Sequence, residues 1–171
     1  LKIKFRESFR PFAPIVLQEH VHEYFDVPEG FQSPYMLIVA PVHPDVRCEV
    51  PPEHQDSRGI DKLKAKRSLI PAVTHVDHSA RIQTVDEERN PKLHKLMSTF
   101  YAKTGCPVMI NTSFNVRGEP IVCTPDDAIR CFLTTEMDVL VMGNHIVFKA
   151  QQENLATDQM REVHLSQFQL D

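Results

Sequence analysis

Residues 106–149, "CPVMINTSFNVRGEPIVCTPDDAIRCFLTTEMDVLVMGNHIVFK", alternate between strand-like and helix-like patterns. "CPVMI" predicts a buried strand, because its apolar run has strand length. "TPDDAIRCFLTTEMD" predicts a helix, with Thr124 as N-cap, Pro125 at the first helical position and two aspartates that complement the positive end of the helix dipole. "VLVMG" and "HIVFK" predict two strands that turn at Gly143-Asn144.

Helix and strand signals also alternate in the residues before Cys106. From Pro91, apolar residues fall at helical spacing and Gly105 marks the expected end of that helix. Strand, helix, strand, helix, strand predicts an α/β sheet with helices on at least one face, although the strand order cannot be read. Four earlier segments are expected to be a strand at 13–17 ("APIVL"), a helical or turn-like stretch after it, a strand at 35–42 covered on both faces ("YMLIVAPV"), and two strands around a turn at 72–85 ("AVTHVDHSARIQTV").

Composition limits the classes of protein. The 171 residues suffice for one domain with its own core, and 42% hydrophobic and 25% charged residues are those of an ordinary globular protein. A net charge of −4 and a pI of about 6.1 argue against nucleic acid as partner, so an anionic ligand would need a few well-placed groups. The composition does not determine the oligomeric state, and a homodimer is one possibility.

The four cysteines contain no C-x-x-C pair, which argues against a zinc site or a disulfide framework and favours a cytoplasmic location. No apolar run is long enough to span a membrane, and no signal peptide is recognisable. The chain opens at Leu1 directly on "KIKFRESFRPFAP", without an initiating Met, which indicates a piece of a longer polypeptide.

That opening segment is the first candidate for chemistry. In an extended conformation Lys4 and Arg6 would point to the same face, with Arg10 nearby. An ammonium beside a guanidinium suits a phosphoryl or carboxylate group, whereas the alternative is a solvated basic segment. The five glycines form neither a dinucleotide-binding fingerprint nor a phosphate loop, so side chains would have to bind any nucleotide.

The second candidate is "NTSFNVRGEP", directly after the strand "CPVMI". Ligands of open α/β sheets sit beyond the carboxyl ends of strands, and there Asn111, Thr112, Ser113 and Asn115 would lie. Pro120 forces an extended backbone on the preceding Glu119. The alternative is a turn that is stabilised by its own side chains.

The third candidate is "HVDHSAR". His75, Asp77 and His78 invite a metal interpretation, but the ligands are too few to favour one. Arg81 could pair with Asp77, or both could face an anionic substrate. No sequence signal ties a Cys or Ser to a general base.

Three segments together resemble the carboxyl-terminal domain of the O-carbamoyltransferases of the nodulation, cephamycin and aminoglycoside types. They are "KFRESFRPFAP" at 4–14, "HVDHSARIQTV" at 75–85 and "TGCPVMINTSFNVRGEPIVCTPDDAIRCFLTTEMDVLVMGNHIV" at 104–147. The resemblance implies a YrdC/Sua5-like twisted mixed sheet with helices packed on it, as a single domain at 1–150. Residues 151–171 are expected to be a polar tail, and a preceding Kae1-like domain is absent from this chain.

The resemblance also implies a reaction: ATP, with Mg²⁺, and carbamoyl phosphate give carbamoyl-adenylate, whose carbamoyl group the Kae1-like domain passes to a hydroxyl of a small molecule, as in antibiotic biosynthesis. YrdC-type domains use a K-x-R pair and an S-x-N pair, which Lys4-Phe5-Arg6 and Ser113-Phe114-Asn115 match. The implied catalytic residues are therefore Lys4, Arg6 and Ser113, with no metal ligands in the protein. The residues expected to bind substrate or nucleotide are Arg10, His75, Asp77, Arg81, Asn111, Thr112, Asn115 and Glu119.

One position departs from the family pattern, because His78 stands where the family commonly has Gly, which restricts that turn and adds a titratable group. His78 would either alter the pocket or occupy the left-handed region. Two other functions remain open. One is a nucleotide- or RNA-binding module without turnover, and the other is a docking domain for the missing part.

Overall fold

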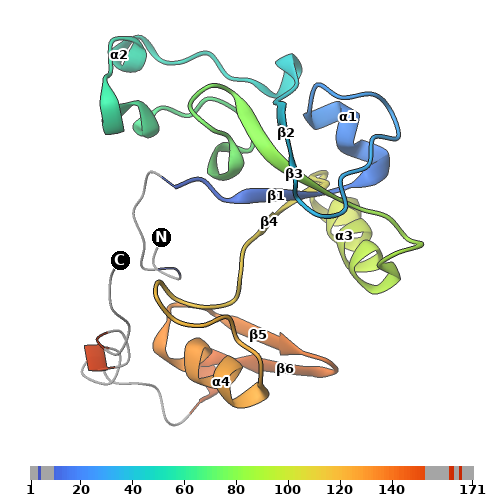
Figure 1. The fold of residues 1–171 in the computed structure, drawn as a ribbon, viewed down its shortest axis with the longest axis vertical. Helices are drawn as coiled ribbons and strands as arrows, with labels where there is room; N and C mark the ends of the chain where they lie inside the picture. The colour runs from blue at the N-terminus through green and yellow to red at the C-terminus, as the bar shows by residue number, and fades with distance from the viewer. Residues whose placement is uncertain (1–3, 5–9, 153–161, 164–165, 167–171) are drawn as a thin grey trace. The chain divides into compact units, whose positions relative to one another are not determined.

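The computed structural model describes residues 4, 10–152, 162–163 and 166. The chain divides into two compact units (Figure 1). One unit is Pro11–Thr112, and the other combines Leu1–Arg10 with Ser113–Asp171. Each unit has its own sheet and its own apolar core.

The sheet of the Pro11–Thr112 unit has four strands in the order β2-β3-β1-β4. They span Ile38–Pro41 (β2), Ser79–Val85 (β3), Ala13–Leu17 (β1) and Val108–Asn111 (β4). β1 runs parallel to β3, whereas β4 is antiparallel to β1 and β2 is antiparallel to β3. The predicted α/β class with a mixed sheet is confirmed.

Alternate residues of β1 point to opposite faces of the sheet, and each set packs into a separate apolar cluster. Val16 belongs to a core that includes Val21 and Phe25 of the segment after β1. Ile15 and Leu17 instead pack with Met97 of α3 (Pro91–Thr104). The predicted strand at 13–17 and the helix from Pro91 are therefore confirmed.

The ends of α3 follow from local chemistry. Pro91 takes the first helical position, and Gly105 closes the helix with φ of 72°, in the left-handed region that a residue with a Cβ rarely adopts. The other helical segments of this unit are short: Gln18–His20, Val21–Tyr24 (α1), Pro44–Val46, Pro52–Gln55 (α2), Gly59–Lys64 and Pro71–Val73.

The prediction of a strand at 35–42 covered on both faces is wrong in length and in burial. β2 has only four residues and lies at the end of the strand order. Leu37, Ile38 and Val39 are exposed, at 80%, 42% and 56%. An apolar run has the same pattern in a central and in an edge strand, so the neighbours decide its burial.

The prediction of two strands at 72–85 is also wrong for the first strand. Pro71–Val73 is a 3-10 turn, and residues 75–78 form a tight turn before β3. His78 has φ of 61°, which confirms that it occupies the left-handed region. Asp77 accepts the backbone N–H of Ser79 at 3.0 Å, a side-chain turn that competes with an extended backbone.

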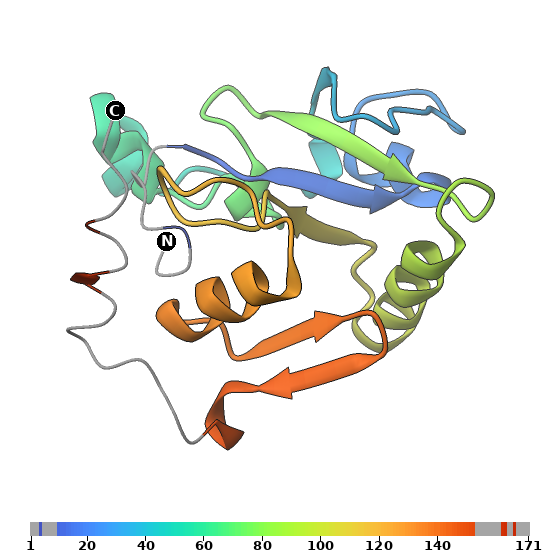
Figure 2. The same ribbon diagram turned by 60° about the horizontal axis from the view of Figure 1, so that its bottom comes forward.

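The other unit is built from α4 (Pro125–Thr134) and the hairpin of β5 (Val139–Met142) and β6 (His145–Phe148), followed by a 3-10 turn at Lys149–Gln151. α4 lies along the hairpin in Figure 2, and Ala128 and Phe132 of the helix bury Leu140 of β5. The hairpin forms a separate two-stranded sheet.

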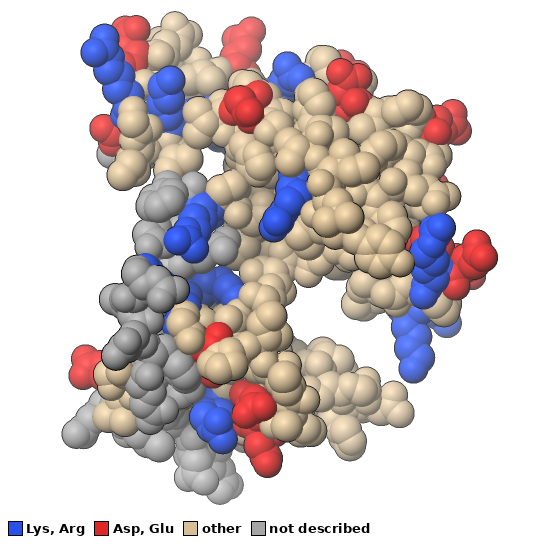
Figure 3. All heavy atoms as spheres, in the orientation of Figure 1, with Lys and Arg blue, Asp and Glu red and all other residues tan. Residues whose placement is uncertain are grey.

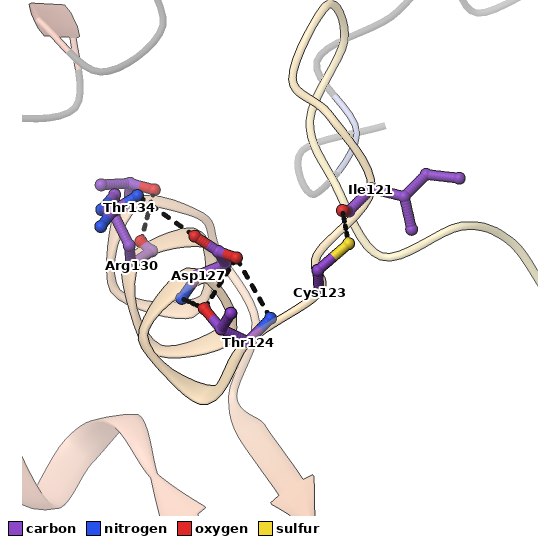
Figure 4. Close-up of polar contacts among 6 residues, drawn as sticks. All are labelled: Ile121, Cys123, Thr124, Asp127, Arg130 and Thr134. Atoms are coloured by element: carbon purple, nitrogen blue, oxygen red, sulfur yellow. Dashed lines mark hydrogen bonds and ion pairs between the residues drawn. The ribbon is translucent and has the colours of Figure 1, made fainter.

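The predicted N-cap of α4 is confirmed. Thr124 Oγ1 accepts the Asp127 N–H at 3.2 Å, while an Asp127 carboxylate oxygen accepts the Thr124 N–H at 3.1 Å, as Figure 4 shows. This reciprocal capping box satisfies two backbone donors that the first turn would leave unpaired. Among the described residues, α3 is the longest helix, and none has the length and apolar character to cross a membrane.

Candidate functional site

The ammonium of Lys4 lies among four oxygen atoms of the S-x-N segment. Lys4 Nζ is 2.6 Å from Ser113 O, 3.3 Å from Ser113 Oγ and 2.7 Å from both Asn115 O and Asn115 Oδ1. The side chain of Lys4 is only 6% exposed. The three protons of an ammonium therefore have four protein acceptors, which offset the cost of burying the charge.

The loop that supplies these oxygens is fixed by its own hydrogen bonds. Asn115 Oδ1 accepts the Ser113 hydroxyl at 2.6 Å, and Asn115 Nδ2 donates to Glu119 O at 2.7 Å. Glu119 Oε2 in turn accepts the N–H of Val116 at 2.8 Å. The sequence predicted that Asn115 and Glu119 bind substrate, and here both hold the loop around Lys4.

A buried thiol lies close to this loop. Cys131 of α4 is 1% exposed. Burial raises its pKa to about 12, and the negative charge of Glu119 and a hydrogen bond to that carboxylate add to the rise, whereas the Lys4 charge opposes it. Cys131 is therefore a neutral thiol at physiological pH and not a nucleophile.

The polar end of β4 lies in the other unit. Asn111 Nδ2 donates to Gln83 Oε1 of β3, and Thr112 is exposed. β4 runs antiparallel to β1, and Asn111 at the carboxyl end of β4 pairs with Ala13 at the start of β1. The carboxyl end of β4 thus lies beside the start of β1, not beside carboxyl ends of parallel strands, so the argument that placed a ligand there does not apply to this sheet.

In the same unit, His75 and Asp77 meet through a residue that the sequence did not predict. Ser79 Oγ lies 2.7 Å from Asp77 Oδ1 and 2.9 Å from His75 Nδ1. The hydroxyl and backbone N–H of Ser79 lower the pKa of Asp77 below its ordinary value, because both stabilise the carboxylate. The regular spacing in H-x-D-x-S was a signal that could have identified Ser79.

The structure describes two of the three predicted arginines. Arg6 lies outside the described residues. Arg10 is exposed, and Arg81 is exposed on β3, opposite Val39 of β2. In the described part of the chain, Asp77 is bound by Ser79 and forms no ion pair with Arg81.

Neither metal-ligating groups nor the surface charge in Figure 3 identifies a further candidate site in the described part of the chain. Within the described ranges, no three His, Cys, Asp or Glu residues are arranged to hold a metal ion. Acidic and basic side chains are interspersed on the face shown in Figure 3, in keeping with the small net charge of −4. Recognition of an anion would therefore depend on local groups such as Lys4.

A comparison with known protein families identifies the family of this chain. The family profile described as "Carbamoyltransferase C-terminus" matches residues 1–149. The chain belongs to this carbamoyltransferase family, as the resemblance predicted.

Three relatives illustrate the similarity. The uncharacterized protein sll1178 of Synechocystis sp. is 54% identical over 171 residues, which is 100% of this chain and 27% of that protein. The nodulation protein NolNO of Sinorhizobium fredii is 40% identical over 148 residues, 86% of this chain and 19% of that protein. The 3'-hydroxymethylcephem-O-carbamoyltransferase of Amycolatopsis lactamdurans is 34% identical over 143 residues, 84% of this chain and 23% of that enzyme.

The chain thus spans about a fifth to a quarter of the length of these relatives. The family description places the matched region at the carboxyl terminus of a carbamoyltransferase. Most of the polypeptide of each of these three relatives consequently lies outside the region compared.

Proposed function

We propose that this chain is the carbamoyl-adenylate-forming module of a carbamoyltransferase, and that it uses ATP with Mg²⁺ and carbamoyl phosphate. A Kae1-like part of the same polypeptide would then transfer the carbamoyl group to a hydroxyl of a small molecule. Family membership supports the transfer of a carbamoyl group in general. The adenylate step rests on the residues that the family resemblance implies.

The observation that carries the proposal is the contact of Lys4 with Ser113 and Asn115. Lys4 belongs to the K-x-R pair, and Ser113 and Asn115 form the S-x-N pair. Lys4 is 109 positions from Ser113 and 111 positions from Asn115 in the sequence, yet its side chain contacts both residues. Their combination of a buried cation, a hydroxyl and an amide suits phosphate and carbamoyl oxygens. Mg²⁺ would be carried on the phosphates of ATP, as is usual for this ion.

The proposed chemistry balances as follows. Water cleaves carbamoyl phosphate into carbamate and phosphate. A carbamate oxygen attacks the α-phosphorus of ATP, the bond from that phosphorus to the bridging oxygen breaks, and pyrophosphate leaves. Lys4 would stabilise the charge that builds up in this transfer through its electrostatic field, because its protons are already shared with loop oxygens. Ser113 is exposed, and its hydroxyl would donate to a phosphate or carbamoyl oxygen by turning its single proton away from Asn115 Oδ1.

The test is pyrophosphate release by the chain with ATP, Mg²⁺ and carbamoyl phosphate. Ser113→Ala should lower the rate about 100-fold, the usual effect of removing one donor that stabilises transferred charge. Lys4→Ala should abolish release, and Lys92→Ala, an exposed lysine at the start of α3, should leave it unchanged. Equal rates in Ser113→Ala and in the wild type would contradict the assignment.

Isothermal titration with a non-hydrolysable ATP analogue separates the proposal from the docking alternative. The small share of the relatives' length that this chain covers keeps a docking function open. Saturable binding that Lys4→Ala abolishes would support the nucleotide site. A folded chain that does not bind at millimolar ligand would reject adenylate formation by this chain and favour the docking domain.

A further inference from the structure

Three side chains before and at the start of β3 form a continuous hydrogen-bonded chain. Ser79 Oγ lies between His75 Nδ1, at 2.9 Å, and Asp77 Oδ1, at 2.7 Å. The backbone N–H of Ser79 also donates to Asp77 Oδ1, at 3.0 Å. A single carboxylate oxygen therefore binds Ser79 twice, and the hydroxyl links it to the imidazole.

The protons in this chain can be assigned from its chemistry. An ionised carboxylate only accepts hydrogen bonds, so the single proton of the Ser79 hydroxyl lies toward Asp77. The hydroxyl oxygen then has only lone pairs to offer His75. Nδ1 must therefore carry a proton and donate it, which leaves Nε2 of the neutral imidazole with its lone pair.

The backbone holds the two partners of the imidazole in place. His75 N–H donates to Ser79 O at 2.8 Å, and His78 N–H donates to His75 O at 3.1 Å. Ser79 begins β3 and pairs with Pro41 of β2, and Val42 N–H donates to His78 O at 2.7 Å. The tight turn is thus anchored to an ordered strand pair, so the orientation of Ser79 toward His75 is built into the fold.

We infer that Ser79 is a positioning residue that fixes His75 with Nε2 as a hydrogen-bond acceptor for an N–H group of the substrate. The inference rests on the proposed function, in which the amino group of carbamoyl phosphate is the available N–H donor. Asp77 acts through Ser79, because its Oδ1 accepts both the hydroxyl and the backbone N–H of Ser79.

A purely structural function for Ser79 makes a different prediction. If its hydroxyl only stabilised the turn, its removal would cost stability and leave the protonation of His75 unchanged. Stability therefore does not distinguish the two functions. The response of the His75 tautomer to the loss of the Ser79 hydroxyl does distinguish them, because only the positioning function makes the tautomer depend on that hydroxyl.

The first experiment measures that tautomer in the whole 171-residue chain. Imidazole ¹⁵N chemical shifts are recorded at a pH of about 8.5, where an ordinary histidine is neutral. We expect His75 to show a protonated Nδ1 and an unprotonated Nε2. Ser79→Ala should shift the tautomer ratio toward Nε2–H on the order of fivefold, the effect of losing one net hydrogen bond. Ser79→Thr keeps the hydroxyl at a strand position and should restore the wild-type spectrum.

The second experiment tests the ligand. Acetyl phosphate matches carbamoyl phosphate but has a methyl group where the latter has its amino group. The wild type should bind carbamoyl phosphate more tightly than acetyl phosphate, and Ser79→Ala should reduce this preference on the order of fivefold while leaving acetyl phosphate binding unchanged.

The outcomes are distinguishable. A wild-type His75 with its proton on Nε2, or a tautomer ratio that Ser79→Ala leaves unchanged, would overturn the inference. Equal binding of the two acyl phosphates would overturn the assignment of the N–H donor. If the folded wild type binds neither phosphate, the proposed function and the assignment of the N–H donor both fail, while the tautomer measurement still decides whether Ser79 positions His75.

Discussion

Replacing Asn115 by Ala should open the loop that surrounds Lys4. The amide of Asn115 makes three hydrogen bonds: to Lys4 Nζ, to the Ser113 hydroxyl and to the Glu119 carbonyl. Each contributes about 1 kcal/mol net. Because Asn115 is half-buried and water can replace part of this bonding, we expect a total loss of about 2 kcal/mol.

Hydrogen exchange followed by mass spectrometry is the suitable assay, since it reports local opening and the chain contains no Trp. The N–H groups of Val116 and Val122 report on the loop, because they donate to Glu119 Oε2 and Phe114 O. A loss of 2 kcal/mol should speed their exchange about 30-fold. Far-UV circular dichroism would confirm that the helices persist.

Two further variants sharpen this prediction. Asn115→Asp keeps the oxygen that faces Lys4 but loses the donor to the Glu119 carbonyl, so the exchange rate should lie between those of Asn115→Ala and the wild type. Asn90→Ala is the matched control, because Asn90 precedes α3 without a side-chain capping bond. If the N–H groups of Val116 and Val122 exchange no faster in Asn115→Ala than in Asn90→Ala, the three hydrogen bonds do not hold the loop.

Three other results are expected. Thr124→Ala should destabilise α4 by about 1 kcal/mol in chemical denaturation while Thr124→Ser costs a few tenths, and equal losses would refute the capping box. The hydroxyl and N–H of Thr124 lower the pKa of Asp127, so this contribution is present above the ordinary aspartate pKa of about 3.9 and is lost as pH falls through the folded value. Thr124→Ala should therefore flatten the acid dependence of helicity, and an unchanged acid titration would contradict the linkage. His78→Gly should raise the melting temperature, because it relieves the strain of a φ of 61° and so stabilises the fold by up to about 1 kcal/mol. His78→Val should lower the melting temperature, and the reverse order of the two variants would exclude backbone strain at this turn.

The predictable elements are those whose signals lie within one segment. Pro91 and Gly105 bound α3 as expected, and Thr124 caps α4. The β5–β6 hairpin follows from Gly143, whose φ of 57° suits the turn. Each of these features depends on hydrogen bonds between residues a few positions apart.

The candidate site was only partly predictable. The resemblance named Lys4, Ser113 and Asn115, and these three residues do meet. It did not show that Glu119 supports the loop, nor that Ser79 connects His75 with Asp77. Those functions depend on which donor reaches which acceptor, and residue identity alone does not specify that geometry.

The sequence by itself determined the ends of α3, the capped start of α4 and the family. Tertiary structure alone decided that β2 is an exposed edge strand and that β4 runs antiparallel to β1. It also decided that the ammonium of Lys4 is buried among oxygen atoms of Ser113 and Asn115, which lie 109 and 111 positions further along the sequence. The physical reason is range: caps and turns are local, whereas strand order and the solvation of a buried charge depend on contacts between segments far apart in the chain.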